Sequence, residues 1–153
     1  MARHIENLTE LKALVGEHLG YSEYMEITQE RVQLFADATG DQQWIHTDPE
    51  RAKAQSPFGG PIAHGYLTLS LGPVLLPQVF TVGQVAMGVN YGANKVRFMA
   101  PVPVGAKLRA GVKLLSVDDI AGGAQVTIET TFETEGASKP SCVAEVIFRY
   151  YSA

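Results

Sequence analysis

Two residues capable of acid–base chemistry, Asp41 and His46, stand five positions apart in the segment 40–46 (GDQQWIH). A carboxylate and an imidazole that converge on one small volume can move protons to and from a substrate, which is general acid–base catalysis. Five extended residues span roughly 16 Å, so the two side chains meet only if the chain between them curls. Trp44 and Ile45 are too apolar to face water and are the expected anchors of that curl.

A structural role for the same pair is the alternative. An Asp that follows a glycine in a turn often accepts hydrogen bonds from nearby main-chain amides. A histidine near a helix start is often simply a satisfied polar residue. The segment 58–66 (FGGPIAHGY) favours the catalytic interpretation, because it places a His-Gly pair, His64-Gly65, at the start of a long apolar run.

Helix signals on both sides fix the ends of the loop that carries the pair. Thr28, followed by apolar residues at helical spacing, predicts an amphipathic helix that Gly40 closes in the left-handed conformation. Asp48-Pro49 joins an N-cap residue to a proline at the first helical position, so a second helix begins there. The pair is therefore expected on a loop between two helices.

The remaining elements follow from hydrophobic periodicity. Residues 1–20 predict an N-terminal helix extension, in which Asn7 and Glu10 resemble a capping box and Gly20 ends the apolar spacing. Residues 21–27 predict a strand, and residues 55–62 predict irregular chain. The apolar run that starts at Ala63 predicts one long helix, buried nearly all round, which Pro73 ends or kinks.

From Gln84 onward the apolar period changes from helical spacing to two. Long strands joined by short turns are expected within the ranges 84–100, 108–114, 126–133 and 142–150. Such strands form an antiparallel sheet, and the apolar helix must pack against its concave face. The 153 residues contain no repeat or linker, so we expect a single domain over residues 1–153 of the α+β class.

Composition excludes several classes of function. The net charge of −4 argues against nucleic acid and against an anionic membrane surface as partners. The single cysteine, Cys142, excludes an internal disulfide, is expected in the core and fits a reducing cytosol. No signal peptide is recognisable, and polar residues and prolines interrupt the longest apolar run, so no membrane span is expected. Four scattered histidines give no metal-ligand spacing.

These motifs resemble the MaoC-like dehydratase family, which includes the (R)-specific enoyl-CoA hydratases. The family motif, Gly-Asp-x-Asn-Pro-aliphatic-His followed by Ala or Ser, stands here as residues 40–46 and Ala52. An apolar-His-Gly element stands at residues 62–65, and a second family segment at 96–105. The resemblance covers roughly residues 25–150, and the Gln-Trp variant of the motif is most similar to the nodulation-protein-N-like branch.

The resemblance implies a single hot-dog domain, in which a curved antiparallel sheet wraps a long central helix. It also implies a homodimer with active sites at the interface, and no cofactor. Asp41 and His46 carry over as the catalytic pair, and the Gly65 main-chain N–H as the donor to the substrate oxyanion. Residues expected to contact the substrate are Trp44, Ile45, Ala63, His64 and Tyr66.

Two positions depart from the family pattern. Gln43-Trp44 replaces the usual Asn-Pro, so Trp44 is expected to reshape the acyl pocket. Pro73 stands where some hydratases carry a serine, so no serine is carried over. His64 has two interpretations, since it either bonds the thioester region or braces the helix start.

The expected function is (R)-specific hydration of trans-2-enoyl-CoA to 3-hydroxyacyl-CoA, reversible and cytoplasmic, in fatty-acid metabolism. One alternative is a 3-hydroxyacyl-thioester dehydratase that acts on acyl carrier protein, and another is a non-catalytic acyl-thioester-binding subunit. Thioesterase activity is disfavoured, because residues 65–80 contain no Asp or Glu. Four basic residues of the strand region either meet the coenzyme A phosphates or form a solvated face: Lys95, Arg97, Lys107 and Arg109.

Overall fold

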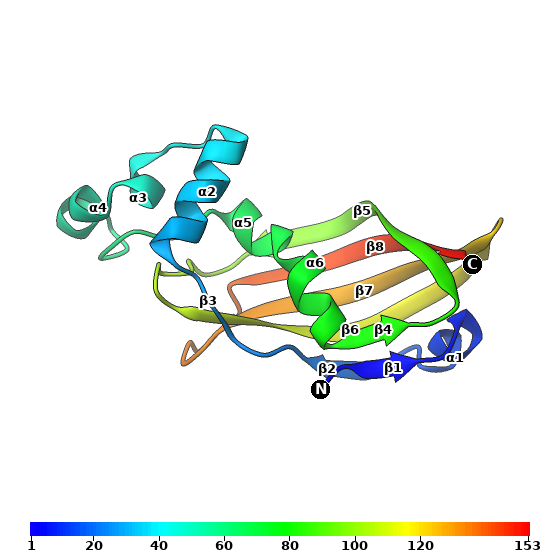
Figure 1. Ribbon diagram of the computed structural model, residues 1–153. Coiled ribbons are helices and arrows are strands. Elements are labelled where there is room, and N and C mark those ends of the chain that lie inside the picture. Colours follow the sequence, from blue (N-terminus) through cyan, green and yellow to red (C-terminus); the bar gives the residue numbers. More distant parts are fainter.

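The computed structural model describes residues 1–153 and is built on one curved sheet (Figure 1). Its main sheet is antiparallel and six-stranded, in the order β2-β6-β7-β8-β5, with β3 paired to β6 beside β2. Its strands are β2 (His18–Tyr21), β3 (Met25–Glu26), β5 (Val85–Phe98), β6 (Lys107–Ile120), β7 (Gly123–Thr134) and β8 (Cys142–Ser152). The predicted antiparallel sheet and the α+β class are confirmed.

The alternation of side chains explains which face of the sheet is covered. Four residues of β6 and four of β7 point to the core and are at most 1% exposed: Leu108, Ala110, Val112, Leu114, Val126, Ile128, Thr130 and Phe132. The pairing of β5 with β8 shifts register at three places, and such bulges bend a strand. The sheet is therefore concave toward the central helices, which lie across it (Figure 1).

The central helix is divided into three short pieces, α5 (Gly65–Ser70), α6 (Gly72–Leu75) and the 3₁₀ turn η1 (Leu76–Gln78). Pro73 causes the first break, because it has no N–H to continue the helical ladder. The expectation of one continuous helix is wrong at this point, whereas the expected effect of Pro73 is confirmed.

Burial around the central helix is one-sided. Leu67, Leu71 and Leu75 recur every four residues and pack on the sheet side. Tyr66 and Val74, on other sides, are 70% and 44% exposed. The prediction that this helix is buried nearly all round is therefore wrong for the single chain, which leaves an apolar flank open.

The N-terminal region differs from its prediction. Helix α1 (Leu8–Ala13) begins as expected, with the Asn7 side chain accepting the Glu10 N–H at 2.8 Å. It does not continue toward Leu19, because Gly16 takes a positive φ of 94° and donates its N–H to Leu114 O. The chain then enters β2, while β1 (Arg3–Ile5) pairs in parallel with β4 (Phe80–Val82).

Three helices gather at one end of the sheet: α2 (Gln29–Thr39), α3 (Trp44–Thr47) and α4 (Pro49–Gln55) (Figure 1). Their predicted ends are confirmed. The Thr28 hydroxyl accepts the Arg31 N–H, Gly40 closes α2 with a φ of 84°, and Asp48 caps α4. Helix α3 is a single turn that the sequence did not predict.

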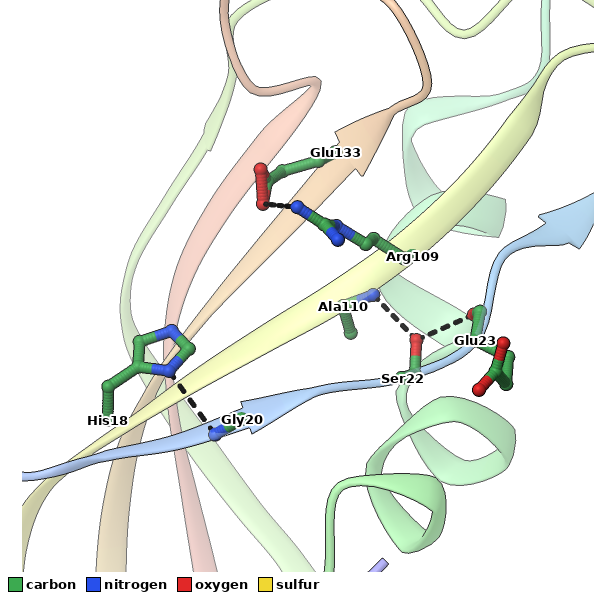
Figure 2. Close-up of polar contacts among 7 residues, drawn as sticks. All are labelled: His18, Gly20, Ser22, Glu23, Arg109, Ala110 and Glu133. Carbon is green, nitrogen blue, oxygen red and sulfur yellow. Dashed lines mark hydrogen bonds and ion pairs between the residues drawn. The ribbon is translucent and has the colours of Figure 1, made fainter. Parts of the chain in front are cut away.

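Polar contacts fasten the chain at β2 and just after it to β6 (Figure 2). The Ser22 hydroxyl accepts the Ala110 N–H at 2.9 Å and donates to Glu23 O at 2.9 Å. On the other face of β6, Arg109 lies 3.6 Å from Glu133 and 4.1 Å above the Tyr21 ring. Arg109 is thus committed to contacts within the sheet, which favours its interpretation as part of an ordinary strand face.

The core consists of two clusters of 12 buried residues on the concave side of the sheet, one beside α1 and η1 and one beneath α2 and α5. Cys142 belongs to the second cluster and is fully buried, as expected, and burial raises the pKa of its thiol to about 11. No helix in the chain has the length and apolar character needed to cross a membrane.

The left-handed cap at Gly40 should be sensitive to substitution. We expect Gly40→Ala to lower the free energy of unfolding by about 1 kcal/mol, because a Cβ is strained at this positive φ. Urea titration of both proteins measures the difference. Gly60→Ala is the matched control, since Gly60 is also surrounded by open space but lacks a positive φ. Equal effects of the two substitutions would contradict the strain argument.

Candidate active site

Asp41, His46 and His64 come together where the α2–α3 loop meets the chain before α5. One carboxylate oxygen and one ring nitrogen from each histidine all lie within 4.8 Å of one another. The expected convergence of Asp41 with His46 is present. Two of the four histidines gather here although the sequence showed no metal-ligand spacing, and with Asp41 they form a set of donors that divalent transition metals also use, so the absence of a metal stays a prediction.

His46 is held in a defined orientation on α3. Its Nδ1 lies 2.7 Å from Ile62 O, and since a carbonyl can only accept, Nδ1 carries the hydrogen. Nε2 is therefore the unprotonated nitrogen of the neutral ring. From α2, the Gln29 side-chain amide donates to His46 O at 2.7 Å.

The ring is only 6% exposed, and this burial is the main reason that the pKa of His46 lies below its usual value of 6.5. The neighbouring His64 lowers this pKa further, whereas the Ile62 carbonyl and Asp41 oppose the shift. His46 is accordingly neutral near pH 7 and can accept a proton.

Asp41 is exposed and directly follows the Gly40 cap. One of its carboxylate oxygens accepts the Gln43 N–H at 3.3 Å, so part of the structural role considered from the sequence is present. A carboxylate has two oxygens and several lone pairs, so this one long contact leaves it able to accept further hydrogen bonds. The Thr47 hydroxyl donates to Gln42 O at 3.1 Å and holds the curl.

His64 is 3% exposed and touches both members of the pair. Its ring stacks on the His46 ring with centroids 3.9 Å apart, and its Nε2 lies 3.0 Å from the Asp41 main-chain O. Its Nδ1 is buried without a hydrogen-bond partner. The sequence placed His64 near the substrate but gave no signal for the stacking, which depends on tertiary packing.

Gly65 is the first residue of α5, so its N–H has no partner within the helix. It lines a cavity of about 350 Å³ together with Ile62, whose carbonyl holds the His46 ring. A Cβ at position 65 would lie 3.0 Å from the Phe98 ring. The cavity beside the Gly65 amide, where the sequence places a thioester, is thus bounded by Phe98. The Phe98 ring leaves no room at position 65 for a residue larger than glycine.

The other predicted substrate contacts take different positions. Ala63 lines the same cavity, and Tyr66 is exposed with its ring edge-on to Phe98. Ile45 O accepts the Ile62 N–H at 3.0 Å, and Trp44 lies beneath the Arg51 guanidinium, 4.3 Å from its ring centroid. Both side chains are only half-buried, so the loop is held here by the Ile45 carbonyl and by the Arg51–Trp44 contact, and contact of Trp44 and Ile45 with a substrate stays a prediction.

Comparison with known proteins assigns the chain to a family. A family model described as "MaoC like domain" matches residues 10–136. The chain belongs to the MaoC-like dehydratase family. Relatives include 3-hydroxyacyl-thioester dehydratase Z of Mycobacterium tuberculosis, 56% identical over 149 residues that cover 97% of this chain and 98% of the relative.

Two further comparisons agree with this assignment. Nodulation protein N of Rhizobium leguminosarum is 41% identical over 150 residues, which cover 94% of this chain and 91% of that protein. An R-hydratase structure from Pseudomonas aeruginosa has a TM-score of 0.75 at 24% identity, over 96% of this chain and 86% of that one, and shows the shared fold. The expected hot-dog fold, family and hydro-lyase class are confirmed.

This MaoC-like domain holds a second cavity, of about 470 Å³, between the central helix and the sheet. It lies beyond the start of α5, next to the helix break at Gly72 and Pro73. Its lining is largely apolar, with side chains from α5, η1, β5, β7 and β8: Leu69, Leu76, Ala93, Phe132, Val146 and Phe148. The concave face of the sheet thus offers apolar volume along the same helix that begins at Gly65.

The lowered pKa of His46 predicts how the free energy of unfolding changes with pH. Below pH 6.5 the unfolded chain takes up a proton that buried His46 resists, so the free energy of unfolding should fall on acidification. The stability advantage of the wild type over His46→Gln should be largest above pH 6.5 and smaller at pH 5, by urea titration. Exposed His4→Gln is the control. An advantage that grows toward acid would contradict the burial argument.

Proposed function

We propose that this MaoC-like protein hydrates trans-2-enoyl-CoA to (R)-3-hydroxyacyl-CoA and catalyses the reverse dehydration, in fatty-acid metabolism. One observation carries the proposal: the Asp41 carboxylate converges with a neutral His46 ring whose Nδ1 is already bonded. The name of the mycobacterial relative, a 3-hydroxyacyl-thioester dehydratase, supports a thioester substrate. The (R) configuration rests on the family resemblance.

The proposed chemistry needs a base and an acid around one water molecule. The water oxygen bonds to C3 of the enoyl group while a proton from the water passes to the Asp41–His46 pair. A proton from the pair is delivered to C2, so the double bond is consumed and no net proton is released. Neutral His46 suits the accepting role, and each positioned group contributes about 10²–10⁴-fold to the rate.

The Gly65 N–H is the proposed donor to the thioester oxygen, on which negative charge builds as water attacks. A donor aimed at a developing oxyanion lowers the barrier by about 3 kcal/mol. Gly65 lines the smaller cavity, and the larger cavity follows along the same helix. We therefore assign the thioester to the start of α5 and the acyl tail to the apolar space beside α5 and η1.

The acyl thioester could be carried either by coenzyme A or by acyl carrier protein. An acidic carrier protein would need a basic docking surface on this chain. We favour coenzyme A, because the family that the motifs resemble includes the (R)-specific enoyl-CoA hydratases. A cytosolic location is part of the proposal, supported by a free and buried thiol at Cys142.

The first test is the loss of enoyl-thioester absorbance with crotonyl-CoA and with longer trans-2-enoyl-CoAs. We expect Asp41→Asn and His46→Gln each to lower kcat/KM by at least about 100-fold, the loss typical of a positioned acid or base. The control for Asp41 is exposed Asp118→Asn, and circular dichroism checks folding.

Wild-type activity that both substitutions leave intact would refute the assignment of the pair. Activity on an acyl-carrier-protein thioester and on no coenzyme A thioester would show that acyl carrier protein, and not coenzyme A, is the carrier. Binding of enoyl thioesters without turnover of any of them would favour the non-catalytic subunit.

We further propose that a second copy of the chain covers the open apolar flank. Strand β5 is an edge strand, exposed or half-exposed along its whole length, and such edges pair readily. Exposed apolar side chains continue from β5 onto the central helix: Tyr66, Val74, Met87, Val89, Tyr91 and Phe98. One copy would bury this surface of the other in a homodimer.

A charge placed on β5 should disrupt this homodimer. We expect wild type to sediment as a dimer, and Met87→Glu/Val89→Glu to shift it toward monomer, because burying carboxylates in an apolar interface is costly. Val15→Glu is the matched control, since Val15 is exposed to a similar degree (44%) but lies outside β5. Monomeric wild type in analytical ultracentrifugation would refute the proposal.

A further inference from the structure

We propose that His64 is a positioning residue of the hydration reaction, which fixes the Asp41 main chain and keeps the His46 ring uncharged and in place. The inference rests on the proposed function and extends it by one residue. It goes beyond the two roles that the sequence left open, contact with the thioester and a brace for the helix start.

The first argument is that one side chain contacts both halves of the pair. The Nε2–H of His64 donates to Asp41 O at 3.0 Å, which ties the loop after α2 to the residue before α5. The face of the same ring lies on His46, with a centroid separation of 3.9 Å and planes 25° apart. Phe35 of α2 contacts the His64 ring at a centroid distance of 4.9 Å, so the ring has little freedom to move.

His64 also links the pair to the proposed oxyanion donor. It is the residue that directly precedes Gly65, and its main-chain O accepts the Thr68 N–H at 3.3 Å within the first turn of α5. A shift of the His64 ring would therefore move Asp41 relative to the Gly65 N–H. In this way one residue sets the distance between the proton-transfer groups and the donor to the thioester oxygen.

The second argument is the open nitrogen of the ring. Because Nε2 donates to a carbonyl, Nδ1 is an acceptor, and it is buried without a partner. A buried polar atom without a partner lowers the stability of the fold. A residue that only braced the helix would not need such an atom. Glutamine could donate to the same carbonyl without placing a second titratable ring against His46.

The third argument is electrostatic. The titratable groups that act on the His46 ring are His64, from the chain before α5, and Asp41, from the loop after α2. Helix α2 contributes only the neutral Gln29 amide, and Ile62 only a main-chain carbonyl. A positive charge on either of two stacked imidazoles disfavours a charge on the other, so His64 helps to hold His46 as a neutral base.

Two substitutions separate the hydrogen bond from the charge effect. His64→Gln keeps an N–H donor for Asp41 O but removes the second imidazole. His64→Phe keeps an aromatic ring against His46 but removes both the donor and the second imidazole, so the difference between the two variants isolates the hydrogen bond. His4→Gln, at an exposed histidine outside the site, is the control. Thermal unfolding and circular dichroism establish that each variant is folded.

The readouts are the pH dependence of kcat and kcat/KM on enoyl-CoA and an NMR titration of His46 without substrate. In His64→Gln, we expect the His46 titration and the acid limb of kcat/KM to move together to higher pH, because the repulsion is gone. In His64→Phe, which also lacks the second imidazole, we expect the same movement of the His46 titration and, in addition, a fall in kcat of about tenfold or more at every pH with little change in KM, as for lost positioning. His4→Gln should match the wild type.

A His46 titration and an acid limb that stay unchanged in His64→Gln would overturn the charge effect. A wild-type kcat in His64→Phe would overturn the positioning of Asp41, and the two results together would reduce His64 to a helix brace. If the wild type turns over no thioester, the proposed function fails. The NMR titration then still decides by itself whether His64 controls the charge of His46.

Discussion

The main-chain carbonyl of Ile62 orients the His46 ring by accepting its Nδ1 hydrogen across 2.7 Å. This bond selects the tautomer, joins chain segments that are 16 residues apart and faces no competition from water, because the ring is buried. The segment that supplies the carbonyl is itself fixed at both sides. Ile62 donates its N–H to Ile45 O, and Ala63 donates to Val102 O. The position of the proposed base therefore depends on main-chain geometry rather than on a flexible side chain.

The same short segment determines what the neighbouring residues can do. Once Ile62 and Ala63 are held, His64 must enter the space between Asp41, His46 and Phe35, and Gly65 must begin a helix at the cavity wall. In this way Ile62 orients the proposed base and Ala63 lines the cavity. His64 contacts both members of the pair, and Gly65 presents an unpaired amide. A displacement of this segment would alter all four contacts together.

Much of the fold could be predicted from the sequence wherever short-range physics decides. The caps at Thr28, Gly40 and Asp48 are local hydrogen bonds and one left-handed residue, and all three are present. Strand alternation in β6 and β7 was equally readable. The errors arise where pairing with a strand far away in the sequence outweighs the local helical pattern. Residues 18–21 gain a partner in β6 and leave the helical pattern, with Gly16 as the turning point.

The candidate site was predictable in part for the same reason. Asp41 and His46 could be paired because the signals that curl their loop lie within a few residues of them. The stacking of His64 on His46 could not, because it depends on how the chain before α5 packs under α2. The exposed side of the central helix was also unreadable, since an apolar sequence does not tell whether its cover is the same chain or another copy.

The break at Gly72-Pro73 separates two tasks that one continuous helix would couple. Helix α5 carries the amide of Gly65 and, at its far end, Leu69 of the larger cavity, whereas Pro73 and Leu76 of that cavity lie beyond the break. A displacement at one end of a broken helix is transmitted to the other end less directly than in a continuous helix. An exchange at Leu76 can therefore alter the depth of that cavity while the Gly65 amide keeps its position, whereas an exchange at Pro73 would remove the cause of the break. Under the proposed assignment of the acyl tail to that cavity, such an exchange would change the preferred acyl length and leave the oxyanion donor where it is.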